Sequence, residues 1–268
     1  MEKKFIKKLY QQHLEAKPFL DKKRIESFID EVFHFLFQLE DKKYLSINAI
    51  QDRLKEIKDE FCLVLLEIMD DKDKTLAIVE DFTKALPEIY QSLLDDANAI
   101  LENDPAATSL KEVKIAYPGF YAIAVYRFAH QLLQQNVQLL PRLWTEYAHS
   151  KTGIDIHPGA KIGKRFFIDH GTGIVIGESC IIGDDVKIYQ GVTLGALSVS
   201  KSEANKQRHP IIEDRVVIYS NATILGGKTK IGHDSVIGGN VWLTHSIQPN
   251  SMVFHKSQIK IKDNNNKF

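Results

Sequence analysis

The amino-acid sequence predicts an α + β protein, in which an N-terminal α-helical domain over residues 1–150 precedes a parallel β-helix over residues 151–250. Two observations predict this fold class. Apolar residues recur at helical spacing in the first half and every six residues in the second half. A fixed six-residue period is typical of a β-helix, because each hexad forms one short strand and one turn. Residues 251–268 are expected to form a C-terminal tail.

Apolar stripes predict the helices of the first half. Residues 21–40 place their apolar side chains on one helical face behind Asp21, a suitable N-cap. Residues 46–69 repeat the pattern behind Ser46. A further helix is expected from Pro118, because proline lacks an N–H and suits the first helical turn. These stripes indicate contacts between helices and carry no chemistry by themselves.

Aliphatic or small apolar residues mark the six-residue period of the second half. They fall at Ile156, Ile162, Ile168, Ile174, Cys180, Val186 and Val192, then at Ile212, Ile218 and Ile224, and, one residue late, at Ile231, Ile237 and Leu243. Three hexads close one triangular coil, so residues eighteen apart are expected to stack on neighbouring coils, about 4.8 Å apart. This count places Asp169 between Lys151 and Lys187.

Residues 195–210 interrupt the six-residue period. The segment is polar and basic, and it ends in Arg208 and His209. Insertions in solenoids form loops on one face, which is often the binding face. We therefore expect a functional loop in which the arginine holds an anion and the histidine handles a proton. The simpler alternative is a tolerated surface excursion.

Composition argues against several classes of protein. Lys plus Arg equal Asp plus Glu at 35 each, so no net field attracts nucleic acid or an anionic membrane. No apolar run approaches the ~20 residues that span a bilayer, and we expect no membrane partner. The two cysteines, Cys62 and Cys180, are far apart and lack metal-ligand spacing. This usage favours a reducing cytoplasm and argues against a disulfide scaffold.

An acid and an imidazole interrupt the apolar stretch RFFIDHGTGIVIG at Asp169 and His170. A carboxylate that accepts one imidazole N–H leaves the other ring nitrogen free as a base. Such a base can deprotonate a hydroxyl as it attacks an acyl carbonyl. Two readings stay open here: Asp169 could instead pair with Lys151 and Lys187 along an edge, where an exposed ion pair contributes little.

Other features of the sequence favour direct transfer of an acyl group. There is no Gly-x-Ser-x-Gly motif, and neither cysteine has an activating context, so no acyl-enzyme is expected. Asp155 precedes His170 by fifteen residues, which places them on adjacent coils. A corner of the coil could bring them together, but the spacing alone leaves this open.

Five motifs carry a resemblance to a known family. NDPAATS, DIHPGAKIG, IDHGTGIVIGE, QGVTLGA and RHP follow one another in the order seen in bacterial serine O-acetyltransferases, which are hexapeptide-repeat acyltransferases. The resemblance covers residues 100–245 closely and the preceding helices more loosely. It implies a left-handed β-helix, although parallel crossovers are usually right-handed.

The resemblance implies acetyl transfer from acetyl-CoA to the hydroxyl of L-serine, the first step of cysteine biosynthesis. In this reading His170 is the general base, Asp155 orients it, and His209 stabilises the oxyanion. Asp104 and Asp169 would hold the ammonium of the amino acid, and Arg208 its carboxylate. The residues implied at the acetyl-CoA site are Thr193, Gly195 and Ser220. No metal is implied.

The resemblance also implies partners. Family members form trimers with active sites between subunits, the helical domain commonly pairs two trimers, and L-cysteine often inhibits at the serine site. The Gly-Val-Pro-Ala-Arg motif that many members carry near the coenzyme is absent from the tail. A complex with the cysteine synthase sulfhydrylase is not expected, because the chain ends in Phe268 rather than isoleucine.

Three alternatives remain at the level of sequence. The acceptor could be another hydroxylated compound, such as homoserine or a sugar. Zinc is a second alternative, since some β-helix carbonic anhydrases bind it through three histidines; here His149, His157, His170 and His209 show no recognised ligand spacing. A non-catalytic scaffold is the third, but it would leave an acid–imidazole pair beneath a charged loop without a purpose.

Overall fold

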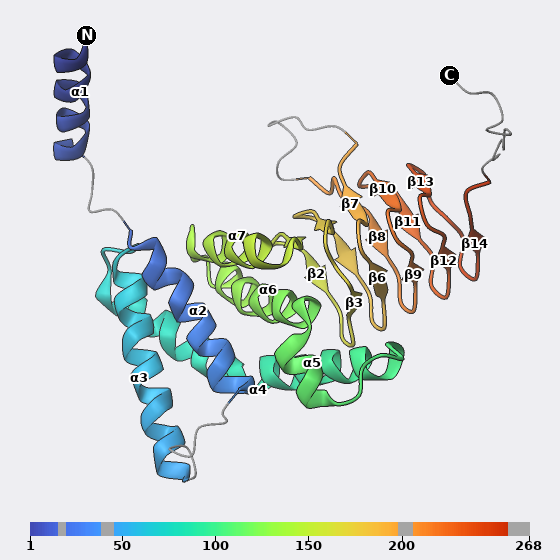
Figure 1. Ribbon diagram of the computed structural model, residues 1–268, viewed down its shortest axis with the longest axis horizontal. Coiled ribbons are helices and arrows are strands. Elements are labelled where there is room, and N and C mark those ends of the chain that lie inside the picture. The colour runs from blue at the N-terminus through green and yellow to red at the C-terminus, as the bar shows by residue number, and fades with distance from the viewer. Residues whose placement is uncertain (16–19, 39–45, 198–205, 257–268) are drawn as a thin grey trace, which may run out of the picture.

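The computed structural model describes residues 1–15, 20–38, 46–197 and 206–256. Helices fill the first half and short strands the second, as the two sequence periods predict (Figure 1). The helices are α1 (Glu2–Glu15), α2 (Lys22–Phe37), α3 (Ile47–Leu66), α4 (Lys72–Asn103), α5 (Leu110–Ala116), α6 (Pro118–Gln134) and α7 (Leu140–Thr152). The α + β fold class is confirmed.

The predicted caps begin the helices where the sequence placed them. The Asp21 carboxylate accepts the Arg24 N–H at 3.2 Å, and the Ser46 hydroxyl accepts the Ala49 N–H at 3.1 Å. Each side chain satisfies one of the N–H groups that the first helical turn leaves without an intrahelical partner. Pro118 begins α6, as expected.

An aromatic core holds the helical domain together. Phe28 stacks on Phe61 with ring centroids 5.2 Å apart, and Phe61 meets the Phe82 ring edge-on at 5.1 Å. Trp144 of α7 packs against all three rings and is fully buried. The same apolar cluster continues into the first coil of the solenoid through Phe166 and Phe167, so the two halves share one core.

The solenoid is a three-sided parallel β-helix whose coils advance away from the helices (Figure 1). One sheet has the order β1-β4-β7-β10-β13, the second β2-β5-β8-β11 and the third β3-β6-β9-β12-β14. The strands are β1 (Asp155–Ile156), β2 (Lys161–Ile162), β3 (Phe167–Asp169), β4 (Val175–Ile176), β5 (Ile181–Ile182), β6 (Lys187–Tyr189), β7 (Thr193–Gly195), β8 (Ile211–Ile212), β9 (Val217–Ile218), β10 (Thr223–Leu225), β11 (Lys230–Ile231), β12 (Val236–Ile237), β13 (Trp242–Leu243) and β14 (Met252–Val253).

The pairing of strands differs from the prediction that residues eighteen apart stack on neighbouring coils throughout. Asp155 pairs with Val175, twenty residues on, because the corner after β3 holds two more residues than a regular hexad allows. Val175 then pairs with Thr193, eighteen residues on. The one-residue insertion before Ile231 is confirmed, since Ile212 pairs with Ile231. The sequence repeat does not reveal the first insertion. Buried residues occur on both sides of each corner, so the hydrophobic pattern looks regular with or without two extra residues.

With this pairing, Asp169 does not lie between Lys151 and Lys187, as the spacing of eighteen predicted. Asp169 pairs with Tyr189 and not with Lys187. Lys151 lies in α7, where its ammonium donates to Asp30 at 3.0 Å. The structural alternative for Asp169 is therefore wrong, and this carboxylate has no lysine above or below it in the strand ladder.

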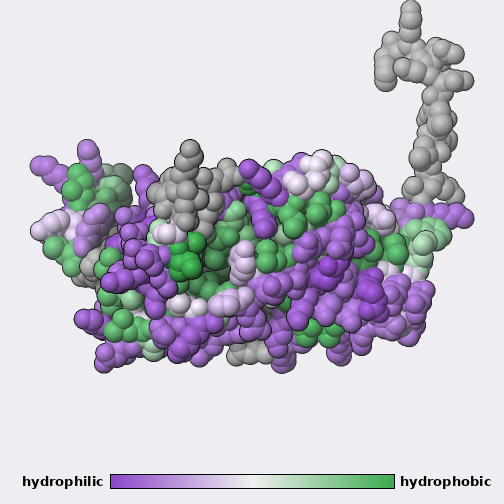
Figure 2. All heavy atoms as spheres, turned by 90° about the horizontal axis from the view of Figure 1, so that it is seen from below, coloured by the Kyte–Doolittle hydropathy of each residue, from purple (hydrophilic) through white to green (hydrophobic). Residues whose placement is uncertain are grey.

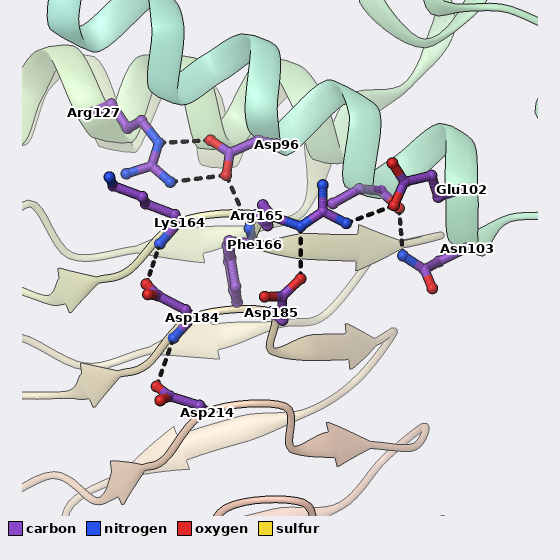
Figure 3. Close-up of polar contacts among 11 residues, drawn as sticks. Asp96, Glu102, Asn103, Arg127, Lys164, Arg165, Phe166, Asp184, Asp185 and Asp214 are labelled. Carbon is purple, nitrogen blue, oxygen red and sulfur yellow. Dashed lines mark hydrogen bonds and ion pairs between the residues drawn. The ribbon is translucent and has the colours of Figure 1, made fainter.

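A buried ion pair joins the helical domain to the first coil (Figure 3). Arg127 of α6 donates to both carboxylate oxygens of Asp96 in α4, at 2.6 and 2.9 Å, and also to the Gly163 carbonyl at 2.8 Å. Asp96 in turn accepts the Phe166 N–H at 2.9 Å. The pair bonds directly to the backbone on both sides of Arg165, and so sets the position of the solenoid against α4 and α6.

Charged corners continue this junction along the solenoid. Figure 3 shows Arg165 between Glu102 of α4 and Asp185 of the next coil, to which it donates at 2.5 and 2.7 Å. Asp184 and Asp214 accept backbone N–H groups of the preceding coil at 2.7 and 2.9 Å. Carboxylates at these corners therefore bond backbone N–H groups that lie outside the strand ladders.

The outer surface is mostly hydrophilic on the face shown in Figure 2, where hydrophobic residues form separate patches. Helix α1 stands apart from the rest of the chain (Figure 1) and exposes Phe5, Ile6, Leu9, Tyr10 and Leu14. None of the described helices is both long and apolar enough to cross a membrane.

We predict that Asp96→Ala destabilises the fold by about 3–5 kcal/mol, because it leaves the Arg127 guanidinium buried without its carboxylate. Urea unfolding followed by circular dichroism measures this change. Glu80→Ala, which removes an exposed ion pair between Glu80 of α4 and Lys58, is the matched control and should leave the midpoint nearly unchanged. Equal midpoints for the two variants would contradict the structural role of the pair.

Candidate active site

The corner after β3 carries His170 out into solvent. Its side chain is 69% exposed, and its Nε2 lies 3.7 Å from the Asp169 carboxylate. The backbone turns through Gly171 and Gly173, both at positive φ, and these residues supply the extra length of the corner. The imidazole is thus presented on the outside of the coil wall and not in the apolar interior.

The positive φ of His170 is a property of the corners in general. Asp185, Asn221 and Asp234 adopt the same left-handed conformation at other corners, with φ near +58°. Asp, Asn and His are the residues most often found there after glycine. The backbone conformation of His170 therefore carries no functional argument, and its neighbours must supply one.

Asp104 joins this corner from the helical domain. It caps the C-terminus of α4, accepting the Ala106 N–H on Oδ1 at 2.8 Å and the Tyr117 hydroxyl on Oδ2 at 2.6 Å. The hydrogen bond to Asp104, together with burial and the negative charges of Asp104, Glu112 and Asp169, raises the pKa of Tyr117 to about 12. Asp104, Tyr117, Asp169 and His170 thus form one group, which we call the His170 edge.

Arg208 and His209 lie on a different edge of the solenoid. Arg208 is paired with Glu178, and His209 is 8% exposed beneath it. The His209 Nδ1 faces the Ser179 N–H at 3.1 Å and the Ser179 hydroxyl at 2.9 Å. That hydroxyl already accepts the backbone N–H groups of Arg208 and His209, so its own proton points to Nδ1.

These contacts define the protonation state of His209. Burial, followed by the positive charge of Arg208, lowers the pKa of His209 to about 4. Because Nδ1 accepts, the proton of the neutral ring sits on Nε2. His209 is therefore a neutral hydrogen-bond donor, the form that stabilises an oxyanion without supplying a proton.

Asp155 lies with Arg208 and His209. Its carboxylate is 3.7 Å from the Arg142 guanidinium, and its charge acts on His157, whose pKa is lowered mainly by burial. In the described part of one subunit, Asp169 is the polar contact of the His170 ring and Asp155 does not reach it. We call Asp155, His157, Glu178, Arg208 and His209 the Arg208 edge. The orienting role predicted for Asp155 stays a prediction.

The residues predicted for the coenzyme lie on and beside the sheet between the two edges. Thr193 and Gly195 belong to β7, where Thr193 pairs with Val175 and Thr223. Ser220 follows β9 at the same edge as His170, two coils further on. Residues 198–205 of the predicted loop lie outside the described residues, as do residues 257–268 of the tail.

A cavity of about 330 Å³ opens at the Arg208 edge, lined by Lys161, Glu178, Ser179, Gln207 and Arg208 among others. No three His, Cys, Asp or Glu side chains approach closely enough to hold a metal ion in the part of the chain that the structure describes. Sequence reasoning missed Tyr117 and Ser179. Their roles depend on hydrogen bonds to Asp104 and His209, and no motif marks such contacts.

The sequence is similar to those of known serine acetyltransferases. No family model matches the chain. The chain is 52% identical over 193 residues to the plasmid serine acetyltransferase of Synechococcus elongatus, and the match covers 70% of the chain and 59% of that relative. It is 43% identical over 164 residues to the serine acetyltransferase of Bacillus subtilis, covering 61% and 73% of the two chains.

The fold is also similar to solved structures of serine acetyltransferases. Serine acetyltransferase isoform 3 of Entamoeba histolytica, solved in complex with cysteine, superposes with a TM-score of 0.78 at 34% identity, covering 92% of this chain and 85% of the other. The soybean enzyme complexed with serine gives 0.61 at 28% identity, covering 92% and 86%. The Brucella abortus enzyme with coenzyme A gives 0.62 at 26%, covering 88% and 79%.

The helical half followed by a parallel β-helix, together with these relatives, makes the chain a hexapeptide-repeat acyltransferase. The chain belongs to the serine acetyltransferase family. Its solenoid is accordingly a left-handed β-helix, as the motifs predicted.

We predict that His209 titrates near pH 4 and stays neutral at pH 6–8. A depressed histidine pKa means that protonation favours the unfolded state, so stability falls as pH drops from about 6.5 towards 4. Deuterium exchange at the histidine C2 position, followed by mass spectrometry, reports the pKa of each ring. An apparent pKa of about 6.5 for His209 would contradict its buried, accepting environment.

Proposed function

We propose that the chain is a serine O-acetyltransferase that moves the acetyl group of acetyl-CoA to the L-serine hydroxyl, giving O-acetylserine and CoA. The observation that carries the proposal is the solvent-facing imidazole of His170 beside the Asp169 carboxylate, with Asp104 held at the same edge by Tyr117. The relatives solved with serine and with coenzyme A support the two substrates. The product is the substrate of a later step towards cysteine.

The chemistry is a direct attack. A free ring nitrogen of His170 accepts the serine hydroxyl proton as the oxygen attacks the thioester carbonyl. The tetrahedral intermediate collapses, the carbon–sulfur bond breaks, and the proton on His170 passes to the leaving thiolate. Burial raises the pKa of the Cys180 thiol to about 12, and burial also raises that of Cys62. Neither thiol is therefore suited to form an acyl-enzyme.

The remaining residues bind and orient. Asp104 and Asp169 hold the serine ammonium; the hydrogen bonds from Tyr117 and the Ala106 N–H keep the Asp104 carboxylate in one orientation. Arg208 pairs with the serine carboxylate in a geometry suited to a planar guanidinium. His209 donates a hydrogen bond from its Nε2–H to the developing oxyanion and keeps the proton.

We infer that these residues meet between subunits of a homotrimer. In one subunit the His170 edge and the Arg208 edge flank opposite sides of the sheet that contains β1, β4 and β7. A β-helix cannot bend to bring two of its edges together, since each coil is locked to the next. A cyclic trimer places one edge of each subunit against another edge of its neighbour. Asp155 then orients His170 across the boundary, and Thr193, Gly195 and Ser220 line the coenzyme groove.

Three further proposals concern partners and location. The assembly is a homotrimer or a dimer of trimers, and in the second case the helical domain pairs the two trimers. L-cysteine competes with serine, a proposal supported by the cysteine complex of the Entamoeba relative. A cytoplasmic location is supported by the two free cysteines. Phe268, on which the sulfhydrylase expectation rests, lies outside the described residues.

Release of free thiol from acetyl-CoA tests the activity. The purified chain is assayed with L-serine, with L-homoserine, with a sugar and with no acceptor. The proposal expects thiol release with L-serine well above the other three reactions. Faster release with another acceptor would move the assignment to that acceptor, and no release with any acceptor would favour a scaffold.

We predict that His170→Ala lowers kcat by about 10²–10⁴-fold, the usual contribution of a general base. His149→Ala is the matched control, because His149 is a half-exposed histidine beside Glu146 in α7. Steady-state kinetics with both substrates measures the change, and circular dichroism checks the fold. Turnover close to that of the control would remove His170 from the mechanism.

We predict that inactive His170→Ala and His209→Ala subunits restore activity when they are unfolded, mixed one to one and refolded together. Random mixing in a cyclic trimer places an intact His170 opposite an intact His209 at about one quarter of the boundaries. The recovered rate should thus approach about a quarter of the wild-type rate. Each variant refolded alone is the control, and a mixture no more active than its components would place both histidines within one subunit.

A further inference from the structure

The His170 edge continues beyond the reaction site as a column of aromatic side chains. Asp169 pairs with Tyr189 on the next coil. The pairing of Ile188 with Ile218 places Tyr219 next to Tyr189 on the third coil. The column leads away from the helical domain along the strands β6, β9, β12 and β14 (Figure 1).

Tyr189 and Tyr219 are stacked, with ring centroids 5.0 Å apart and an angle of 16° between their planes. Tyr189 therefore covers one face of the Tyr219 ring. Tyr219 is nevertheless 44% exposed. On the next coil its neighbour in the column is Gly238, because Ile218 pairs with Ile237, and glycine offers no side chain to cover the second face.

Gly238 and Gly239 leave a recess beside Tyr219, which we call the glycine step. A Cβ on Gly238 would lie 3.0 Å from the Val253 carbonyl oxygen and 3.3 Å from the Phe254 Cα. A Cβ on Gly239 would lie 3.1 Å from the carbonyl oxygen of Ser220, a residue predicted to contact the coenzyme. Phe254 follows on the last coil and is 71% exposed. Tyr219 and Phe254 thus flank a gap floored by backbone.

The dimensions of the gap suit a flat ring. Two coil steps separate Tyr219 from Phe254, which corresponds to about 9.6 Å at the usual strand spacing. A planar group in van der Waals contact on both faces needs about 7–8 Å. The step itself is about 14 Å, or three coil steps, from the coil of His170. A carrier whose reacting end lies at His170 and which follows this edge would bring its far end to the step.

We propose that Tyr219, with Phe254 on the opposite side, forms the stacking site for the adenine ring of acetyl-CoA. The proposal rests on the proposed function, since it takes acetyl-CoA as the donor. Purines stack on aromatic side chains through their π-faces. The exposed His255 and Lys256 directly follow Phe254 and supply cationic or donor groups for the phosphates of the coenzyme.

The test compares two acetyl donors. Acetyl-CoA carries the adenine nucleotide, whereas S-acetylpantetheine has the same thioester and arm without it. Tyr219→Ala should lower kcat/KM for acetyl-CoA by about 5- to 100-fold, the range expected for loss of one base–aromatic stack. It should leave kcat/KM for S-acetylpantetheine and the KM for serine unchanged. Tyr219→Phe keeps the ring and should retain wild-type values.

Tyr10→Ala, which removes an exposed tyrosine from α1, is the matched control and should behave as wild type with both donors. Equal losses with both donors in Tyr219→Ala would overturn the proposal, because the ring would then act on the fold or on the whole arm. An unchanged kcat/KM for acetyl-CoA would overturn it as well. Tyr219 covered by a neighbouring subunit would produce one of these two results.

A binding measurement separates this proposal from the proposed function. Adenosine 3′,5′-bisphosphate contains the nucleotide end of CoA and no thioester. Isothermal titration calorimetry should show that it binds the wild type and Tyr219→Phe about 5- to 100-fold more tightly than Tyr219→Ala. This difference is expected even if the wild type fails to acetylate serine. Equal affinities for the three proteins would remove adenine from the site.

Discussion

The buried pair of Asp96 and Arg127 is the constraint on which the rest of the molecule depends. It joins α4 and α6 to the backbone of the first coil, so it sets where the end of α4 lies relative to β3. Asp104 ends α4 and Asp169 ends β3. The two carboxylates come from the two halves of the chain, and they can hold one serine ammonium, as proposed, only if that junction is rigid. A paired and fully hydrogen-bonded buried charge provides such rigidity, because every displacement exposes an unpaired charge to an apolar interior.

The solenoid imposes a second constraint, since it separates groups that the proposed chemistry brings together. His170 projects from one edge, while Arg208 and His209 are held at another by Glu178 and Ser179. The proposed trimer resolves this separation without deforming any coil. In that arrangement the exposed imidazole receives its partners from a neighbour, and His209, kept neutral by burial and by the charge of Arg208, offers its Nε2–H as a donor. Under this proposal, the rigidity of the β-helix makes assembly part of the active site.

The corner after β3 shows how little sequence is needed to change a repeat. Two additional residues directly after the exposed His170 shift the stacking partner of Asp169 from Lys187 to Tyr189. The shift begins the aromatic column that reaches Tyr219 and the glycine step. One insertion beside the proposed base therefore sets the register of the track along which the coenzyme is proposed to lie.

The sequence by itself determined the helical half, its caps at Asp21 and Ser46, the β-helix and the family, because local periodicity and short motifs dictate these features. It also named His170, Asp169 and Asp104, which the structure brings together at one edge. Only the tertiary structure decided the register of the first coils, the Tyr117–Asp104 and Ser179–His209 contacts and the division of the predicted residues between two edges. These depend on contacts between residues distant in the chain, where a shift of two residues leaves the hydrophobic pattern intact but changes every neighbour.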